Sequence, residues 1–249
     1  MTPYYEDDDV TLYFGDWRKI IAPDFRADLI LTDPPYGETN LEWDRWPDGW
    51  PALAARHADA MWCWGSMRMF LDRRDEFADW TFSQDIVWEK HNGSNLANDR
   101  FNRVHEFSLF WYQGAWADIH HEVPQSADAT KRTIRKKARP AQWIGETGPT
   151  TYTSVDGGPR NMRSVMFARS SHGRALNETQ KPESVNEHLM TYACPPGGTV
   201  LDLFAGSGTT GMVAKQTGRK AVLYELREDQ CEAVARRLAQ GVLDFGDAS

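Results

Sequence analysis

The sequence predicts an α/β fold with a doubly wound, mostly parallel sheet. Short apolar runs of strand length alternate with segments of helical spacing over much of the chain, a pattern typical of parallel sheets covered by helices on both faces. Near the end, the run VLDLFAGSGTTG (200–211) leads from an apolar strand through a glycine-rich turn into a helix. With 249 residues, the chain is long enough for one large domain with an insert.

In the amino-terminal half, the first two expected strands each lead to an acidic residue. Residues 10–14 (VTLYF) precede Asp16, and residues 28–32 (DLILT) precede Asp33. Apolar runs and helical spacing predict the elements that follow. These are a helix over 51–58, a strand over 60–66, a helix over 66–80, and strands over 85–90 and 106–112.

The regular pattern returns near residue 180. Pro182 stands at a favourable first helical position. The glycine turn then separates a strand from a helix, and a second strand and helix follow. We expect strands over 199–204 and 220–226, and helices over 209–217 and 227–240, the last closed by Gly241.

Between these halves, periodicity fades over a stretch too long for an ordinary loop. We therefore expect two halves, at 1–112 and 176–249, separated by an inserted, functional subdomain at 113–175. Residues 131–174 hold ten basic and two acidic side chains, whereas the whole chain has a net charge of −8. A basic segment on an acidic body indicates polyanion binding, and a solvated loop is the alternative.

Composition excludes several classes of protein. No apolar run reaches the length of about 18 residues that a membrane span needs, and the acidic start MTPYYEDDDV is unlike a signal peptide. The three cysteines are widely spaced and form no C-x-x-C pair, so we expect neither disulfides nor a metal site. A reducing cytoplasm fits this composition.

The glycine turn matches the G-x-G-x-x-G fingerprint, and Glu225 follows Gly206 by 19 residues, where an acid accepts ribose hydroxyls. Alone, this fits nicotinamide and flavin enzymes equally well, and a turn without ligand is the alternative. Asp202 lies four residues before Gly206. Its carboxylate would repel a pyrophosphate but suits a cationic amino group, which favours S-adenosylmethionine.

The run LILTDPPYGE (29–38) ends an apolar strand in Asp33, Pro34, Pro35 and Tyr36. The two prolines stop the strand, fix φ and remove two backbone donors. One interpretation is a rigid turn with a capping Asp. The other is a site that holds a flat group bearing an amine.

Five motifs together resemble the amino-group DNA methyltransferases: LYFGD, DPPYG, RVHEFSLFW, ETQKPESV and VLDLFAGSGTT. Their order is similar to that of the beta class, in which the cofactor region comes last. The resemblance covers about 10–112 and 177–241, and it implies a Rossmann-like methyltransferase fold with circularly permuted motif order. It also implies that 1–112 is the catalytic half, 113–175 the target-recognition insert and 176–249 the cofactor-binding half.

The resemblance also implies roles for individual residues in binding S-adenosylmethionine. Asp202 would lie at its methionine end, Glu225 at the ribose and Asp16 at the adenine amino group, while Lys181 packs over the methionine end. The cofactor-binding set is Asp16, Lys181, Asp202, Phe204, Ala205, Gly206, Ser207, Gly208, Thr209, Thr210 and Glu225.

For catalysis, the resemblance implies that the Asp33 carboxylate and the Pro34 carbonyl accept hydrogen bonds from an exocyclic amine. Pro35 helps to fix the direction of that carbonyl, and Tyr36 stacks on the base. The base must be flipped out of double-stranded DNA. The residues expected to contact DNA phosphates are Lys131, Arg132, Arg135, Lys136, Lys137 and Arg139.

N6 of adenine is the favoured target, because N4-cytosine enzymes more often carry Ser in place of Asp33. N4 of cytosine is the nearest alternative. A nicotinamide oxidoreductase would explain only the glycine turn, and an inactive DNA-binding protein would not explain the acids. The resemblance leaves open whether the protein forms a homodimer and whether it acts with a cognate restriction endonuclease. It also leaves open whether the protein works in a bacterial or a phage-infected cell. We expect no membrane partner.

Overall fold

The computed structural model describes residues 2–94, 99–136, 150–169 and 180–240. The chain divides into two compact units. The larger unit combines Met1–Glu122 with Ser164–Ser249, and the smaller unit is Val123–Arg163.

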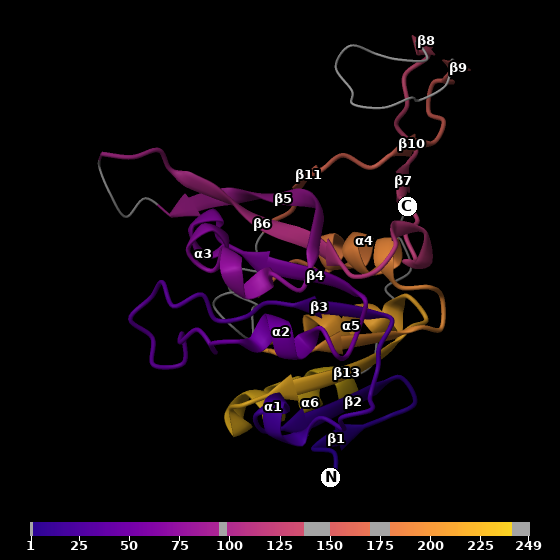
Figure 1. Ribbon diagram of the computed structural model, residues 1–249. Coiled ribbons are helices and arrows are strands. Elements are labelled where there is room, and N and C mark those ends of the chain that lie inside the picture. Colours follow the sequence, from indigo (N-terminus) through magenta and orange to yellow (C-terminus); the bar gives the residue numbers. More distant parts are fainter. Residues whose placement is uncertain (1, 95–98, 137–149, 170–179, 241–249) are drawn as a thin grey trace. The chain divides into compact units, whose positions relative to one another are not determined.

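The larger unit is built on a mixed, mostly parallel sheet, which confirms the predicted α/β class (Figure 1). β2, β13, β12, β3 and β4 are parallel neighbours, whereas β6 pairs antiparallel with both β4 and β5. In spatial order the strands are β1 (Tyr5–Glu6), β2 (Val10–Phe14), β13 (Lys220–Glu225), β12 (Thr199–Asp202), β3 (Leu29–Thr32), β4 (Ala60–Gly65), β6 (Arg103–Tyr112), β5 (Thr81–Ser94) and β11 (Val165–Phe167).

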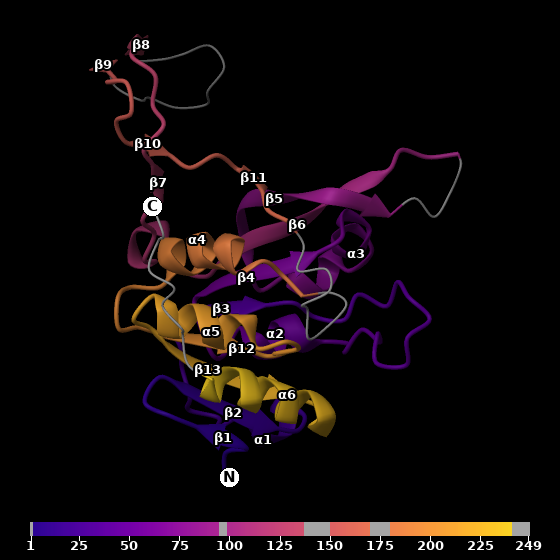
Figure 2. The ribbon, with the colours of Figure 1, turned by 180° about the vertical axis from the view of Figure 1, so that it is seen from behind.

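Helices cover both faces of this sheet. Among the described residues, none of them has the length and apolarity needed to cross a bilayer. Figure 1 shows α1 (Trp17–Ile20), α2 (Trp50–Ala54) and α3 (Met67–Asp72) on one face, and Figure 2 shows α4 (Glu183–Ala193), α5 (Thr209–Gln216) and α6 (Glu228–Ala239) on the other.

Successive strand residues point into two separate cores, one under each layer of helices. In β4, Trp62 and Trp64 pack in the core that includes residues of α4, α5 and α6, and Met61 and Cys63 pack in the other. Side chains alternate between the faces of a strand, so an unbroken apolar run marks a strand buried on both sides.

The pairing of β3 with β12 lies at the centre of the sheet. Leu29 is opposite Val200 and Ile30 is opposite Leu201, in parallel register. The Thr32 hydroxyl donates a 2.9 Å hydrogen bond to Asp202 beyond this register. The DPPY turn and the glycine turn therefore leave the sheet at the same edge.

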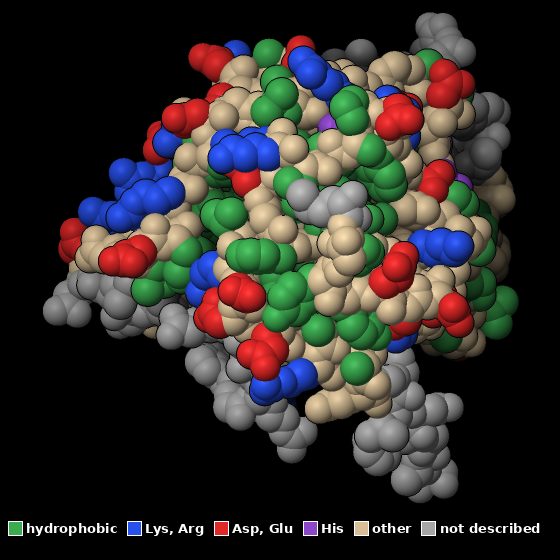
Figure 3. Space-filling model, turned by 90° about the horizontal axis from the view of Figure 1, so that it is seen from below, with side chains coloured by type: hydrophobic (Ala, Val, Ile, Leu, Met, Phe, Trp, Pro, Cys, Tyr) green, Lys and Arg blue, Asp and Glu red, His purple; other side chains and the backbone are tan. Residues whose placement is uncertain are grey.

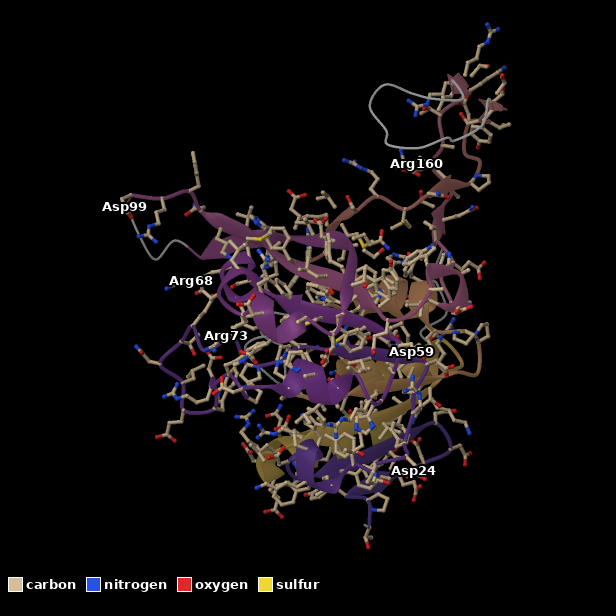
Figure 4. All side chains as sticks on the ribbon, viewed as in Figure 1. Asp24, Asp59, Arg68, Arg73, Asp99 and Arg160 are labelled. Atoms are coloured by element: carbon tan, nitrogen blue, oxygen red, sulfur yellow. The ribbon has the colours of Figure 1, made fainter. Side chains whose placement is uncertain are left out.

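Several elements differ from their predicted bounds. α2 ends at Ala54 and not at 58, α4 begins at Glu183 with Pro182 as its N-cap, and Gly241, expected to close the last helix, lies outside the described residues. Two further differences are larger. The helix expected over 66–80 ends at Asp72 and continues as a 3-10 turn, Arg74–Phe77, after Arg73 leaves helical geometry. The strand expected over 85–90 is longer, because β5 and β6 extend as a hairpin well past the last core residue. Asp99 lies at the far end of this hairpin in Figure 4. A hairpin with polar residues on both faces shows no hydrophobic periodicity.

The smaller unit consists of two short strand pairs, β7 (Gln125–Ser126) with β10 (Arg160–Asn161), and β8 (Thr133–Lys136) with β9 (Thr150–Thr153). Three of the predicted DNA-contacting residues are exposed here: Lys131, Arg132 and Arg135. Lys136 ends β8, and Lys137 and Arg139 lie outside the described residues.

Charges of both signs are mixed on the larger unit. Figure 3 views the unit from below, and it shows acidic and basic side chains interspersed among hydrophobic ones. In exposed ion pairs such as Arg26 with Asp59 (2.6 Å) and Arg68 with Asp72 (3.5 Å), the opposite charges cancel locally. Such pairs contribute little to stability.

The glycine turn has the backbone that its sequence predicts. Gly206 and Gly208 have φ of +51° and +73°, in the left-handed region that favours glycine. A Cβ on Gly208 would lie 2.6 Å from the side chain of Val234 in α6. A Cβ on Gly211 would lie 2.9 Å from Leu223 in β13. The three glycines therefore set the turn and let α5 pack closely.

Gly208→Ala combines a left-handed backbone with a collision at Val234. We expect it to lower the free energy of unfolding by about 2–4 kcal/mol, measured by urea denaturation. Gly218→Ala is the matched control, because Gly218 has φ of +64° but a Cβ added there would meet nothing within 4 Å. Equal losses in the two variants would contradict the packing argument.

Candidate functional site

A cleft of about 740 Å³ lies where the central parallel strands end. In α/β sheets, ligands bind at the carboxyl ends of the strands, next to the point where strand order reverses. The cleft brings together residues from turns far apart in the sequence. Among its lining residues are Asp16, Asp33, Tyr36, Lys181, Asp202 and Glu225.

Asp202 is a buried carboxylate, 4% exposed, at the end of β12. It accepts hydrogen bonds from the hydroxyls of Thr32 (2.9 Å) and Thr210 (2.6 Å) and from the backbone N–H of Phe204 (3.2 Å). Burial raises its pKa to about 6, although these hydrogen bonds act to lower it. All three donors are neutral, so the carboxylate is well placed for a cationic ligand.

Glu225 closes the other side of the glycine turn from the end of β13. Its two oxygens accept backbone N–H groups of Gly206 and Arg227, both at 2.9 Å. Burial raises the pKa of this carboxyl, and the two backbone donors oppose the increase. The hydrogen bond to Gly206 links the acid directly to the turn that the fingerprint predicts.

Asp16 reaches the cleft from the end of β2, as predicted, but it already has a partner. Its carboxylate caps α1 and accepts two 2.9 Å hydrogen bonds from the Arg18 guanidinium. The Arg18 hydrogen bond lowers the pKa of Asp16. The sequence pattern did not indicate this bidentate pair.

Asp33 stands beside Tyr36 and Lys181 in the cleft. The Tyr36 hydroxyl donates a 2.7 Å hydrogen bond to Asp33 Oδ1, and Lys181 Nζ lies 2.5 Å from Oδ2. Burial raises the pKa of Asp33, and the Lys181 ammonium opposes that increase. The DPPY turn is therefore held in a polar network that includes the TQKP motif.

Lys181 also contacts Glu106 of β6, at 3.2 Å. Glu106 in turn pairs with Lys90 of β5. Burial would raise the pKa of Glu106, but the Lys181 and Lys90 ammonium groups hold it at about 2. The Lys181 ammonium further lies 5.8 Å from the ring centre of Tyr36 and 5.6 Å from that of Trp64.

Sequence reasoning placed Glu106 only at a strand start and gave it no role. A signal was present, because the acid stands directly before the largely apolar run FSLFWY of the same strand. Its partner Lys181 lies far along the chain, so the pairing itself was not visible in the sequence.

The loop after the DPPY turn forms the outer wall of the cleft. Asp44, 3% exposed, accepts backbone hydrogen bonds from Gly37 (2.8 Å), Glu38 (3.0 Å) and Thr39 (2.7 Å). These bonds tie the loop into a compact turn. Trp43 lines the cleft from this loop, with the Arg227 guanidinium 5.7 Å from its ring centre.

The remaining residues of the glycine turn divide by position. Gly208 shapes the turn from beneath, against Val234, and the others line the cleft. The lining residues are Phe204, Ala205, Gly206, Ser207, Thr209 and Thr210. Across the described ranges, no group of three or more His, Cys, Asp or Glu residues is arranged to hold a metal ion.

Comparison with known proteins agrees with this arrangement. A family model described as DNA methylase matches residues 27–236. The type II methyltransferase M.ScaI of Streptomyces caespitosus is 26% identical over 263 residues, covering 95% of this chain and 83% of that protein.

Solved structures show the same fold. The complex of M1.HpyAVI with SAM has a TM-score of 0.63 at 22% identity, and the match covers 92% of this chain and 99% of that chain. PvuII DNA methyltransferase (cytosine-N4-specific) has a TM-score of 0.64 at 16% identity, with 99% and 90% covered. Because the family model spans most of the sequence, the chain belongs to the N6/N4 DNA methylase family, as the motif resemblance implied.

Proposed function

We propose that this protein is a site-specific DNA methyltransferase that transfers a methyl group from S-adenosylmethionine to N6 of a flipped adenine in double-stranded DNA. The observation that carries the proposal is the shared cleft of the DPPY turn and the glycine turn. Pairing of β3 with β12 holds the two turns side by side.

The residues of the glycine turn fit S-adenosylmethionine. Asp202 offers a buried carboxylate surrounded by neutral donors, which suits the cationic amino group of the cofactor. Glu225 would accept the ribose hydroxyls, and Trp43 would cover the open side. When bound, the cofactor supplies a methyl group on a sulfonium, a good electrophile.

Asp33 and Pro34 would activate the target amine. The lone pair of an exocyclic amine is delocalised into the ring, so the nitrogen is a poor nucleophile. Accepting its two N–H groups, at the carboxylate and at the carbonyl, favours a tetrahedral nitrogen with a localised lone pair. That pair would attack the sulfonium methyl of the bound cofactor, the sulfur would keep the electrons of the bond that breaks, and the nitrogen would then lose one proton to the Asp33 carboxylate or to water. Positioning and electrostatics supply most of the catalysis.

DNA contact is assigned to the basic residues of the smaller unit. Lys131, Arg132 and Arg135 are exposed there and would neutralise backbone phosphates, which predicts binding that weakens with salt. Extruding the base costs a few kcal/mol, and Tyr36 would recover part of this cost by stacking on it. The formation of a homodimer and the existence of a cognate restriction endonuclease remain predictions from the resemblance.

N4 of cytosine is the second candidate target. It is favoured by the fold similarity to PvuII DNA methyltransferase, which is described as cytosine-N4-specific. Both targets are exocyclic amines, so the same carboxylate and carbonyl would serve either. Asp33 at the first position of the DPPY motif favours adenine, because N4-cytosine enzymes more often carry Ser there.

The direct test incubates the purified protein with methyl-labelled S-adenosylmethionine and mixed-sequence duplex DNA, followed by digestion to nucleosides. We expect the label in N6-methyldeoxyadenosine. Label in N4-methyldeoxycytidine would support the second candidate. Absence of label from both nucleosides would contradict DNA methylation altogether.

Asp33→Ala removes one acceptor of the target amine. We expect the single-turnover methylation rate to fall at least about 1000-fold. Affinity for S-adenosylmethionine, measured by calorimetry, should change little, because Asp202 and Glu225 are retained. Asp44→Ala, which loosens the neighbouring loop instead, controls for general disturbance. An Asp33→Ala enzyme with near-normal rate would refute the assignment.

Binding of S-adenosylmethionine should depend on pH through Asp202. The ionised form binds the cationic amine, and the carboxyl has a pKa of about 6 in the free protein. Lowering the pH through this value protonates Asp202, so affinity should be about tenfold weaker at pH 5 than at pH 7. Titration calorimetry across this range measures the effect. Asp202→Asn should bind weakly at all pH values, and the same slope in that variant would contradict the assignment.

A further inference from the structure

Glu106 belongs to a buried charge cluster that the proposed mechanism does not yet use. Lys181 Nζ lies between two carboxylates, at 2.5 Å from Asp33 and 3.2 Å from Glu106. Lys181 is only 6% exposed. These three side chains together carry one net negative charge at the base-facing end of the cleft, and the Lys90 ammonium beside Glu106 balances it.

This charge matters because the target nitrogen becomes cationic as it gains the methyl group. A lone Lys181 ammonium beside Asp33 would repel that developing charge and would compete for the carboxylate that the amine needs. Inside a protein such interactions are stronger than in water. The site therefore needs a second anion that offsets Lys181.

We propose that Glu106 is a positioning residue for methyl transfer, which offsets the charge of Lys181 so that the Asp33 carboxylate remains an acceptor for the target amine. The inference rests on the proposed function and deepens it. Glu106 contacts Lys181 and Lys90, and its negative charge also acts on the Asp33 carboxyl.

The hairpin of β5 and β6 explains how Glu106 is held in place. Glu106 pairs with Trp88 across the two strands, and the nearby Lys90 side chain binds its other oxygen. Lys90 also lies over the Trp88 ring, at 4.6 Å from its centre. The hairpin thus fixes the carboxylate from the outer side, and one oxygen remains for Lys181.

Three variants test the charge balance: Glu106→Gln, Lys181→Met, and the double variant. Glu106→Gln leaves Lys181 opposite Asp33 alone, and Lys181→Met leaves two carboxylates facing each other. The double variant removes both charges and restores a net charge of minus one, carried by Asp33. Glu89→Gln is the matched control, because Glu89 is exposed on the same hairpin.

We expect each single variant to lower the single-turnover rate at neutral pH by about 10- to 100-fold. The double variant should be faster than either single variant, and Glu89→Gln should match the wild type. Thermal unfolding of each cofactor-free variant checks that a lower rate does not come from loss of the fold.

The pH profile separates this role from a purely structural one. At saturating S-adenosylmethionine, where weaker cofactor binding through Asp202 no longer limits the rate, the acidic limb reports protonation of Asp33. This carboxyl faces Lys181, Glu106 and Tyr36, with Cys63 and Asp202 nearby. Glu106→Gln should move this limb to lower pH and Lys181→Met to higher pH, with the double variant near the wild type.

A double variant no faster than the slower single variant would overturn the inference, as would wild-type activity in Glu106→Gln. A shift of the acidic limb in the same direction in both single variants would also overturn it. If the wild-type protein itself transfers no methyl group to DNA, the proposed function fails first, and the role of Glu106 falls with it.

Discussion

The parallel pairing of β3 with β12 is the contact on which the site depends. Leu29 and Ile30 lie opposite Val200 and Leu201, and both strands are buried on their two faces. A shift of the strand pairing by one residue would turn each side chain to the opposite face of the sheet, so that it would pack in the wrong core. Register is therefore set by the two cores, and it places two chemically different turns within one cleft.

The acids in that cleft behave differently because their neighbours differ. Asp202 is surrounded by neutral donors, so burial dominates and its pKa rises to about 6. Glu106 is partly buried and lies between two ammonium groups, which hold its pKa at about 2. One end of the cleft thus keeps a carboxylate that responds to a cationic ligand, and the other keeps one that stays ionised.

The sequence was sufficient for the parts of the molecule that local pattern determines. Apolar runs located the central strands, and the glycine spacing located the turn that Gly206 and Gly208 form. Pairings between polar side chains were not predictable, whether the partners are near or far apart in the sequence. Arg18 covering Asp16 and Lys181 reaching Glu106 both depend on side-chain direction in the folded chain. The extent of the hairpin was missed because its outer residues pack against no core.

The order of strands along the chain has a consequence for synthesis on the ribosome. The hydrogen bond between Thr32 and Asp202 spans 170 residues of sequence. Until β12 and β13 have been translated, β3 and β2 each have one edge whose backbone N–H and C=O groups lack a neighbouring strand. Such edges favour association with other chains. We expect this molecule to complete its central sheet only after β12 and β13 have been translated, with folding slowed by its long-range contacts.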